Sequence, residues 1–112
     1  MDDSVQVVKG TLDVLVLKAL SATPMHGFEI TMWIEDQSGG GLEFDDSAIY
    51  QAVYRLEKRA FVKATWGVTE NNRRARYYRI TKGGQAHLRA ETRRMLQFTQ
   101  LLTSILQPST RP

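Results

Sequence analysis

Cysteine is absent from this 112-residue sequence, and histidine occurs only as His26 and His87. Without cysteine there can be no disulfide and no thiolate metal site. The two histidines lie far apart and have neither of the short spacings, HxxxH or HxxE, that are typical of metal sites. The SGGG run at 38–41 lacks the lysine and the preceding strand of a phosphate-binding loop. We therefore expect no enzyme activity, no metal and no cofactor.

Long hydrophobic runs are also missing. No stretch approaches the ~20 consecutive apolar residues of a membrane span, and the N-terminal residues do not resemble a signal peptide. The sequence therefore predicts a cytoplasmic protein with no membrane partner. A chain of 112 residues has room for one hydrophobic core and little more.

Charge is distributed unevenly along the chain. Residues 1–54 contain two cations and nine acids, whereas residues 55–112 contain thirteen cations and three acids. The net charge is −7 in the first part and +10 in the second. This division favours a surface that meets a polyanion such as nucleic acid. Solvated charge scattered over the surface is the alternative.

Hydrophobic periodicity predicts helix, helix, helix, hairpin and helix, in that order. The first helix is apolar nearly all round, which indicates a central helix packed on several sides. Thr81 is a candidate cap for the last helix, although Gly83 and Gly84 weaken its first turn. Trp33 and Trp66 are expected in the core or within a strand. The helices are predicted at 12–22, 27–37, 46–59 and 82–107, and the strands at 61–66 and 76–81.

Three helices followed by a two-stranded hairpin are the plan of a winged helix-turn-helix. In that plan the third helix enters the DNA major groove, and the hairpin, or wing, reaches along the backbone. We therefore predict an α+β fold that is mainly α. Its parts would be a DNA-binding domain at 1–81, a C-terminal dimerisation helix at 82–107 and a frayed tail at 108–112.

Polar side chains occupy the face of the third predicted helix that lies opposite its apolar face. At about 100° per residue, this polar face collects hydroxyls, an amide and cations, which can bond base edges and phosphates. Gln51 is the best candidate for base readout, because a glutamine can bond adenine at two points. Tyr50 could equally fill the groove between two helices. The predicted DNA-contacting residues of this helix are Ser47, Tyr50, Gln51, Tyr54, Arg55 and Lys58.

Two further segments have a predicted role. Arg73, Arg74 and Arg76 fall within four residues on the expected hairpin loop, where arginines can bind phosphates or enter the minor groove. The last helix carries more apolar residues toward its C-terminus than a monomer can cover, which indicates a homodimer interface. The predicted interface residues are Met95, Phe98, Leu102, Ile105 and Leu106.

Four motifs together resemble the PadR family of bacterial transcriptional regulators. They are GTLDVLVLKAL (10–20), HGFEI (26–30), AIYQAVYRLEKRAFV (48–62) and RRARYYRITKGG (73–84). The resemblance implies a short, homodimeric winged-helix regulator, usually a repressor, that binds a palindromic operator and dimerises through its last helix. Tyr50 matches the family's recognition motif and inherits its DNA-contacting role. Gln51 stands where the family often has proline, so no operator preference follows.

The sequence thus predicts a sequence-specific regulator that binds double-stranded DNA as a homodimer. Some relatives bind phenolic acids or flat cationic drugs, but nothing here identifies a small-molecule effector. Two alternatives are a winged-helix module that binds protein, because fold alone does not fix function, and a non-specific DNA-binding protein. The polar face of the third helix and the basic C-terminal half favour DNA, and Gln51 favours sequence specificity.

Overall fold

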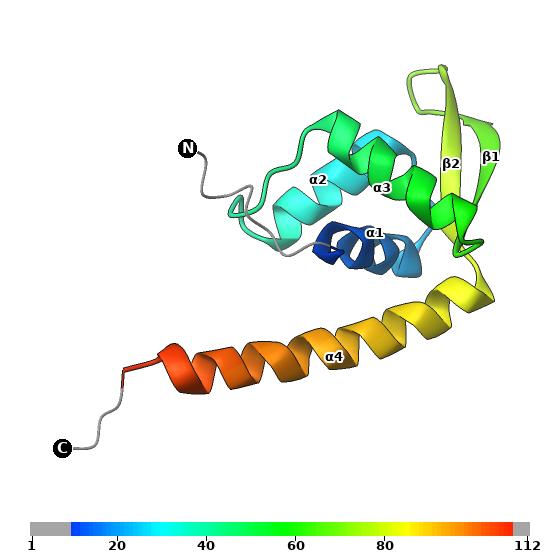
Figure 1. The fold of residues 1–112 in the computed structure, drawn as a ribbon. Helices are drawn as coiled ribbons and strands as arrows, with labels where there is room; N and C mark the ends of the chain where they lie inside the picture. The colour runs from blue at the N-terminus through cyan, green and yellow to red at the C-terminus, as the bar shows by residue number, and fades with distance from the viewer. Residues whose placement is uncertain (1–9, 109–112) are drawn as a thin grey trace.

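The computed structural model describes residues 10–108, within which four helices accompany one antiparallel hairpin (Figure 1). The elements are α1 (Thr11–Ala22), α2 (Gly27–Gln37), α3 (Asp46–Lys58), β1 (Val62–Val68), β2 (Arg74–Ile80) and α4 (Lys82–Leu106). This is the predicted winged-helix fold, with the hairpin as the wing and a long C-terminal helix. Of the predicted tail, only residue 108 lies within the described residues.

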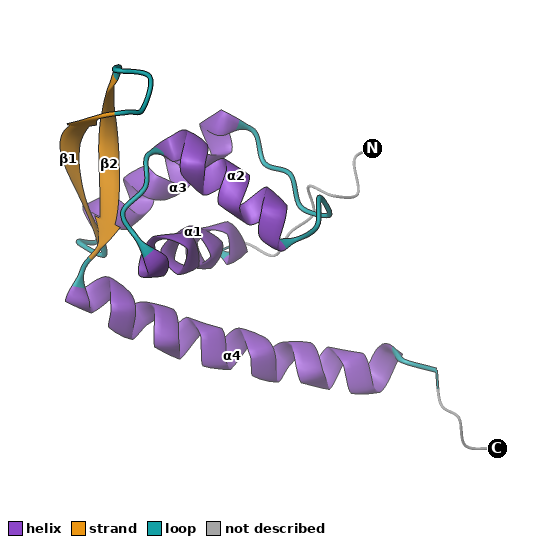
Figure 2. Cartoon of the chain, turned by 180° about the vertical axis from the view of Figure 1, so that it is seen from behind, coloured by secondary structure: helices purple, strands orange, loops and turns teal. Residues whose placement is uncertain are grey.

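The core is built around α1, as the all-round apolar pattern predicts. Val16, Leu17 and Ala19 are fully buried, and α2, α3, α4 and β2 all pack against this helix (Figure 2). Burying a leucine or valine side chain contributes about 1.5–3 kcal/mol, so α1 accounts for much of the stability.

The third helix is attached to this core by one face and ends in a turn that leads directly into the wing. Ile49, Ala52, Val53 and Leu56 are buried. Asp45 is the N-cap, and it makes no side-chain capping bond. At the other end, Ala60 has a φ of 62°, and the Phe61 amide donates to the Leu56 carbonyl. This left-handed cap turns the chain into β1 without an intervening loop.

The strands of the wing are longer than predicted. Pairing runs from Val62 with Ile80 to Val68 with Arg74, so the loop is only 69–73. The prediction that all three arginines lie on the loop is therefore wrong, because Arg74 and Arg76 belong to β2. The ladder continues through Gly67 because the Tyr77 ring covers it: a Cβ at Gly67 would lie 2.7 Å from that ring.

The connection between α1 and α2 pairs with the wing through one residue. The Met25 amide donates to the Tyr78 carbonyl at 3.1 Å, and the Tyr78 amide donates to the Met25 carbonyl at 2.8 Å. These bonds cover one edge of β2 and fix the wing to the helical core. Sequence analysis had predicted only a helix break here, because a single paired residue has no periodicity.

The start of α4 is held in close contact with the end of α3. The Thr81 hydroxyl accepts a hydrogen bond from the Gly84 amide at 3.0 Å, which confirms the predicted cap, and donates to the Ala60 carbonyl at 2.8 Å. A Cβ at Gly84 would overlap the Phe61 carbonyl oxygen, whereas one at Gly83 would have no neighbour closer than 3.7 Å. Gly84 is therefore required by packing.

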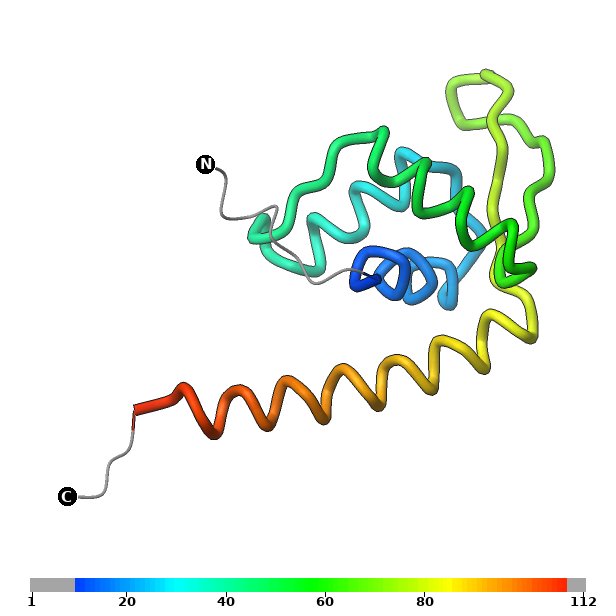
Figure 3. Tube along the Cα trace, in the orientation of Figure 1, coloured from blue at the N-terminus to red at the C-terminus, as the bar shows by residue number. Residues whose placement is uncertain are grey.

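Only the first half of α4 packs on the body of the protein. Leu88 is buried against the core and Met95 is half-buried, but every residue from 96 to 106 is exposed. The helix extends away from the other elements, which makes the molecule elongated, with dimensions of 62 × 30 × 23 Å (Figure 3). Within residues 10–108 no helix combines the length and the apolar character that crossing a bilayer requires.

The two adjacent glycines of α4 provide a matched test of this junction. Gly84→Ala should lower the free energy of unfolding by about 2 kcal/mol, because the methyl group would push α4 away from the Phe61 carbonyl. Gly83→Ala should be neutral or stabilise by up to about 0.5 kcal/mol, because alanine is the better helix former. Urea unfolding followed by circular dichroism measures both, and equal effects would contradict the close approach.

Candidate nucleic-acid interface

Four exposed side chains form a continuous line along α3. Ser47, Gln51, Tyr54 and Lys58 follow one another at spacings of four, three and four residues, and all point away from the core. The Lys58 ammonium lies 5.1 Å from the centre of the Tyr54 ring. We call these four residues the outward strip. The outward strip presents two hydroxyls, an amide and a cation to a ligand that binds along α3.

Tyr50 borders the outward strip and packs against α2 at the same time. A Cβ on Gly27 would lie 2.7 Å from two ring carbons of Tyr50 and from its hydroxyl oxygen. The Tyr50 side chain can therefore occupy this position only because residue 27 is glycine. The Tyr50 side chain nevertheless remains 51% exposed. The two roles considered from the sequence are thus compatible: the ring fills the groove between helices, and its outer edge stays accessible.

Arg55 is held by an ion pair within the protein. Its Nη2 donates to Asp13 Oδ1 at 2.6 Å and its Nε donates to Asp13 Oδ2 at 3.2 Å. These hydrogen bonds raise the pKa of Arg55, partly opposed by desolvation. The bidentate contact joins α3 to α1 and uses two of the donors that a phosphate would need. A DNA contact by Arg55 stays a prediction.

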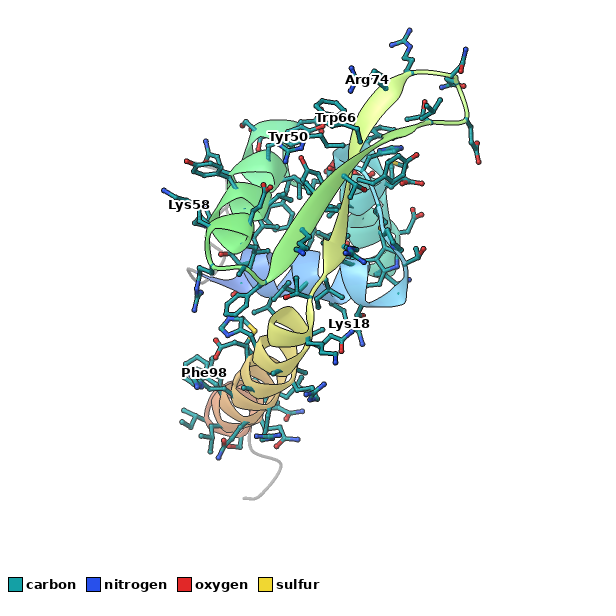
Figure 4. All side chains as sticks on the ribbon, turned by 90° about the vertical axis from the view of Figure 1, so that its right-hand side faces the viewer. Lys18, Tyr50, Lys58, Trp66, Arg74 and Phe98 are labelled. Carbon is teal, nitrogen blue, oxygen red and sulfur yellow. The ribbon has the colours of Figure 1, made fainter. Side chains whose placement is uncertain are left out.

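The wing presents aromatic and cationic side chains on the same face. Trp66 on β1 lies opposite Arg76 on β2, and the guanidinium of Arg74 stacks 4.6 Å from the centre of a Trp66 ring. Arg76 also pairs with Glu57 of α3 at 3.0 Å, which holds the wing beside that helix. Figure 4 shows Tyr50, Trp66 and Arg74 gathered where α3 meets the wing.

A cleft of about 270 Å³ lies between this face of the wing and the first turns of α2 and α3. We call it the aromatic cleft. Its lining includes Phe28, Tyr50, Trp66, Arg74, Arg76 and Tyr78. The Tyr78 ring is buried at the base of the wing, and this burial raises the pKa of its hydroxyl, although the nearby Arg76 opposes the effect.

Sequence analysis missed two members of this cleft. Trp66 is within a strand as expected, but it is 62% exposed, and Phe28 is 61% exposed. The alternation of Val62, Ala64 and Trp66 places these side chains on one face of β1. No feature of the sequence indicated that the outer part of this face would meet the ends of two helices.

His26 fixes the start of α2 beside the cleft. Its Nδ1 accepts from the Glu29 amide at 3.4 Å, and its own amide donates to Glu29 Oε1 at 3.1 Å, which together form a capping box. His26 is thus the N-cap of α2. Across residues 10–108 no three histidine, aspartate or glutamate side chains lie close enough together to hold a metal ion.

A family model decides the relationship that the fold and these residues suggest. The model of the transcriptional regulator PadR-like family matches residues 16–90, which include α2, α3, the wing and the beginning of α4. The chain belongs to this family. Catalysis is not the family's role: its members are transcriptional regulators.

Three proteins illustrate what this PadR-like chain is similar to. One is similar in sequence, and two are similar in structure. An uncharacterised protein of Lysinibacillus sphaericus is 28% identical over 82 residues, which are 73% of this chain and 75% of the other. A transcriptional regulator from Clostridium thermocellum has a TM-score of 0.80 at 24% identity, covering 89% of this chain and 97% of its own. PadR of Bacillus subtilis, solved in complex with operator DNA, has a TM-score of 0.63 at 17% identity, covering 90% of this chain and 50% of its own.

The ion pair between α1 and α3 can be tested by removing one charge. Asp13→Asn should lower the free energy of unfolding by about 0.5–1 kcal/mol, as expected for a partly exposed ion pair, and the loss should shrink in 1 M salt. Asp36→Asn is the control, because Asp36 takes part in no ion pair formed by residues 10–108. Urea unfolding at low and high salt measures both variants. An equal loss in both would contradict a structural role for the pair.

Proposed function

We propose that this PadR-like protein is a cytoplasmic transcriptional repressor that binds a palindromic operator as a homodimer. The observation that carries the proposal is the outward strip of α3, which lies beside a wing that bears arginines. Hydroxyl, amide and cationic groups along one exposed helix face are suited to the major groove, and arginines on the wing to the phosphate backbone.

The outward strip supplies the base contacts in this proposal. Gln51 lies in the middle of the strip and is exposed, so both ends of its amide are free to bond adenine in the major groove. Ser47 and Lys58 lie at the two ends of the helix, where hydroxyl and ammonium groups can bond phosphates. α3 would thus be anchored at both ends while its centre reads the sequence.

The wing supplies sequence-independent affinity. Arg73 lies in the exposed loop, and Arg74 belongs to no ion pair formed by residues 10–108. Cations that bind phosphates release counterions, so affinity should fall steeply with salt. PadR of B. subtilis, which shares this fold, was solved in complex with operator DNA, and this supports DNA as the partner.

The exposed end of α4 supports the homodimer. Phe98, Ile105 and Leu106 are 53%, 75% and 74% exposed, and no charged residue occurs from 95 to 107. An uncharged apolar face of this length is typical of an interface between copies of a chain. Met95 is half-buried against its own core, so its contribution to the interface would be smaller than predicted.

Fluorescence anisotropy with a labelled duplex tests the proposal. The duplex from upstream of the protein's own gene is the first choice, because such regulators often control their own promoters. A scrambled duplex of the same composition is the control, and both are titrated across a salt series. Binding of two chains per duplex with at least about a thousandfold preference over the scrambled duplex is the expected result.

Other outcomes distinguish the alternatives. Weak, equal binding to both duplexes that falls steeply with salt would favour a non-specific DNA-binding protein. An absence of binding to either duplex at low salt would overturn the proposal and favour a module that binds protein.

Two substitutions should separate base readout from backbone binding. Gln51→Ala should relax the preference at one base pair, where it costs about 1–3 kcal/mol, and leave scrambled DNA unaffected. Arg73→Ala should weaken binding to every duplex alike and reduce the salt slope by about one unit. Anisotropy with single-base variants of the operator measures both effects. If Gln51→Ala weakened all duplexes equally, Gln51 would have no role in readout.

The dimer can be tested on the exposed half of α4. Ile105→Glu should convert the protein to a monomer, because it places a charge within the apolar face and within reach of its symmetry mate. Gln100→Glu is the control, because it adds the same charge about 200° around the helix from Phe98. Sedimentation equilibrium gives the mass of each variant, and circular dichroism checks the fold. A dimer that survives Ile105→Glu would place the interface elsewhere.

A further inference from the structure

The aromatic cleft carries exposed rings that neither the core nor the contacts described above explain. Trp66 and Phe28 are the two most exposed aromatic rings of the described residues, at 62% and 61%, and they line the same cleft from the wing and from α2. Leaving large apolar rings in water is unfavourable, and rings gathered around one hollow mark a binding surface.

Charge narrows the class of ligand. Arg74 lies over Trp66 at 4.6 Å, and no aspartate or glutamate lines the cleft. Arg76 is partly neutralised by Glu57 at 3.0 Å, whereas Arg74 is in no ion pair among residues 10–108. A guanidinium held flat on an indole can still direct its donors outward to an anion. The cleft therefore suits a ligand with an anionic group beside an apolar surface.

The size and position of the aromatic cleft also bear on the class of ligand that it can bind. At about 270 Å³, the cleft has room for a small group, such as one unit of a polymer. The cleft lies between Tyr50, which borders the outward strip, and the wing (Figure 4). A DNA strand that crosses from α3 to the wing would have to pass over this opening.

We propose that the aromatic cleft receives one sugar–phosphate unit of the DNA backbone, with Arg74 bound to the phosphate and Trp66 and Phe28 covering the deoxyribose. The inference rests on the proposed function and deepens it by adding a preformed binding site for one sugar–phosphate unit of the backbone. We call this site the seat. Such a seat fixes the register of the protein on DNA, because only one phosphate of each half-site can occupy it.

Phosphate replacement tests the seat directly. Operator duplexes that each carry one neutral methylphosphonate at a different backbone position are titrated against the wild-type protein and against Arg74→Ala. In the wild type, one position per half-site should weaken binding about tenfold. At that same position, Arg74→Ala should show no further loss, because the phosphate has already lost its partner.

Arg79→Ala is the matched control for charge. Arg79 is on the same strand but on the opposite face, paired with Lys63, away from the cleft. Its removal should lower affinity modestly and leave the methylphosphonate profile unchanged. Trp66→Ala should weaken binding about tenfold, whereas Trp66→Phe should stay within about twofold, and circular dichroism confirms that each variant folds.

Tryptophan fluorescence supplies an independent readout. In Trp33→Phe, Trp66 is the only tryptophan, so adding operator DNA should change its emission. In Trp66→Phe, the remaining Trp33 is half-buried and packed on the core, and its emission should stay constant.

The outcomes separate this inference from the proposed function. Wild-type binding with no backbone position coupled to Arg74, or with unchanged Trp66 emission, would overturn the seat and leave the regulator intact. Unchanged DNA affinity in Trp66→Ala would likewise overturn it and assign the rings to a protein partner. A wild-type protein that binds no duplex would overturn both.

Discussion

The burial of α1 is the constraint on which the rest of the structure depends. Val16, Leu17 and Ala19 are completely buried, and they lie on different sides of one helix. No single neighbour can cover such a helix, so α2, α3, α4 and the wing have to surround it. The apolar face of α3 packs against α1, α2 and β1, which leaves its opposite face exposed. The outward strip is therefore a consequence of the core, and the Arg55–Asp13 ion pair adds a polar contact between α3 and α1.

Local signals predicted the elements well, and long-range contacts account for what they missed. Helix positions follow from apolar periodicity, and the caps at His26 and Thr81 follow from side-chain chemistry that acts within three residues. The wing was predicted too short because Gly67 normally weakens a strand. Only the ring of Tyr77, which comes from the other strand, makes glycine acceptable there. The Met25 pairing with β2 is equally invisible until the fold brings the two segments together.

The same distinction applies to the candidate site. The outward strip could be predicted because a helix has a fixed angle per residue, so the buried side defines the exposed side. The aromatic cleft could not, because alternation along a strand gives two faces without saying which one meets α3. Trp66 was therefore expected to be buried or simply within a strand, and its neighbours on α2 were not considered together with it. The ion pair of Arg55, a predicted DNA-contacting residue, could not be predicted either, because its partner Asp13 is distant in sequence.

Two exposed apolar surfaces in this protein differ in charge, and that difference favours a different partner for each. The end of α4 exposes apolar side chains and has no charged residue from 95 to 107, which suits a second copy of the chain. The aromatic cleft is bordered by Arg74 and Arg76, which suits a polyanion. The junction at Gly84 connects the two surfaces, because it fixes the direction of α4 relative to α3. In the proposed dimer that direction determines the separation of the two α3 helices, which has to match about one turn of DNA, roughly 34 Å. In the proposed dimer, the buried Gly84 contact would thus set the spacing at which the two outward strips bind.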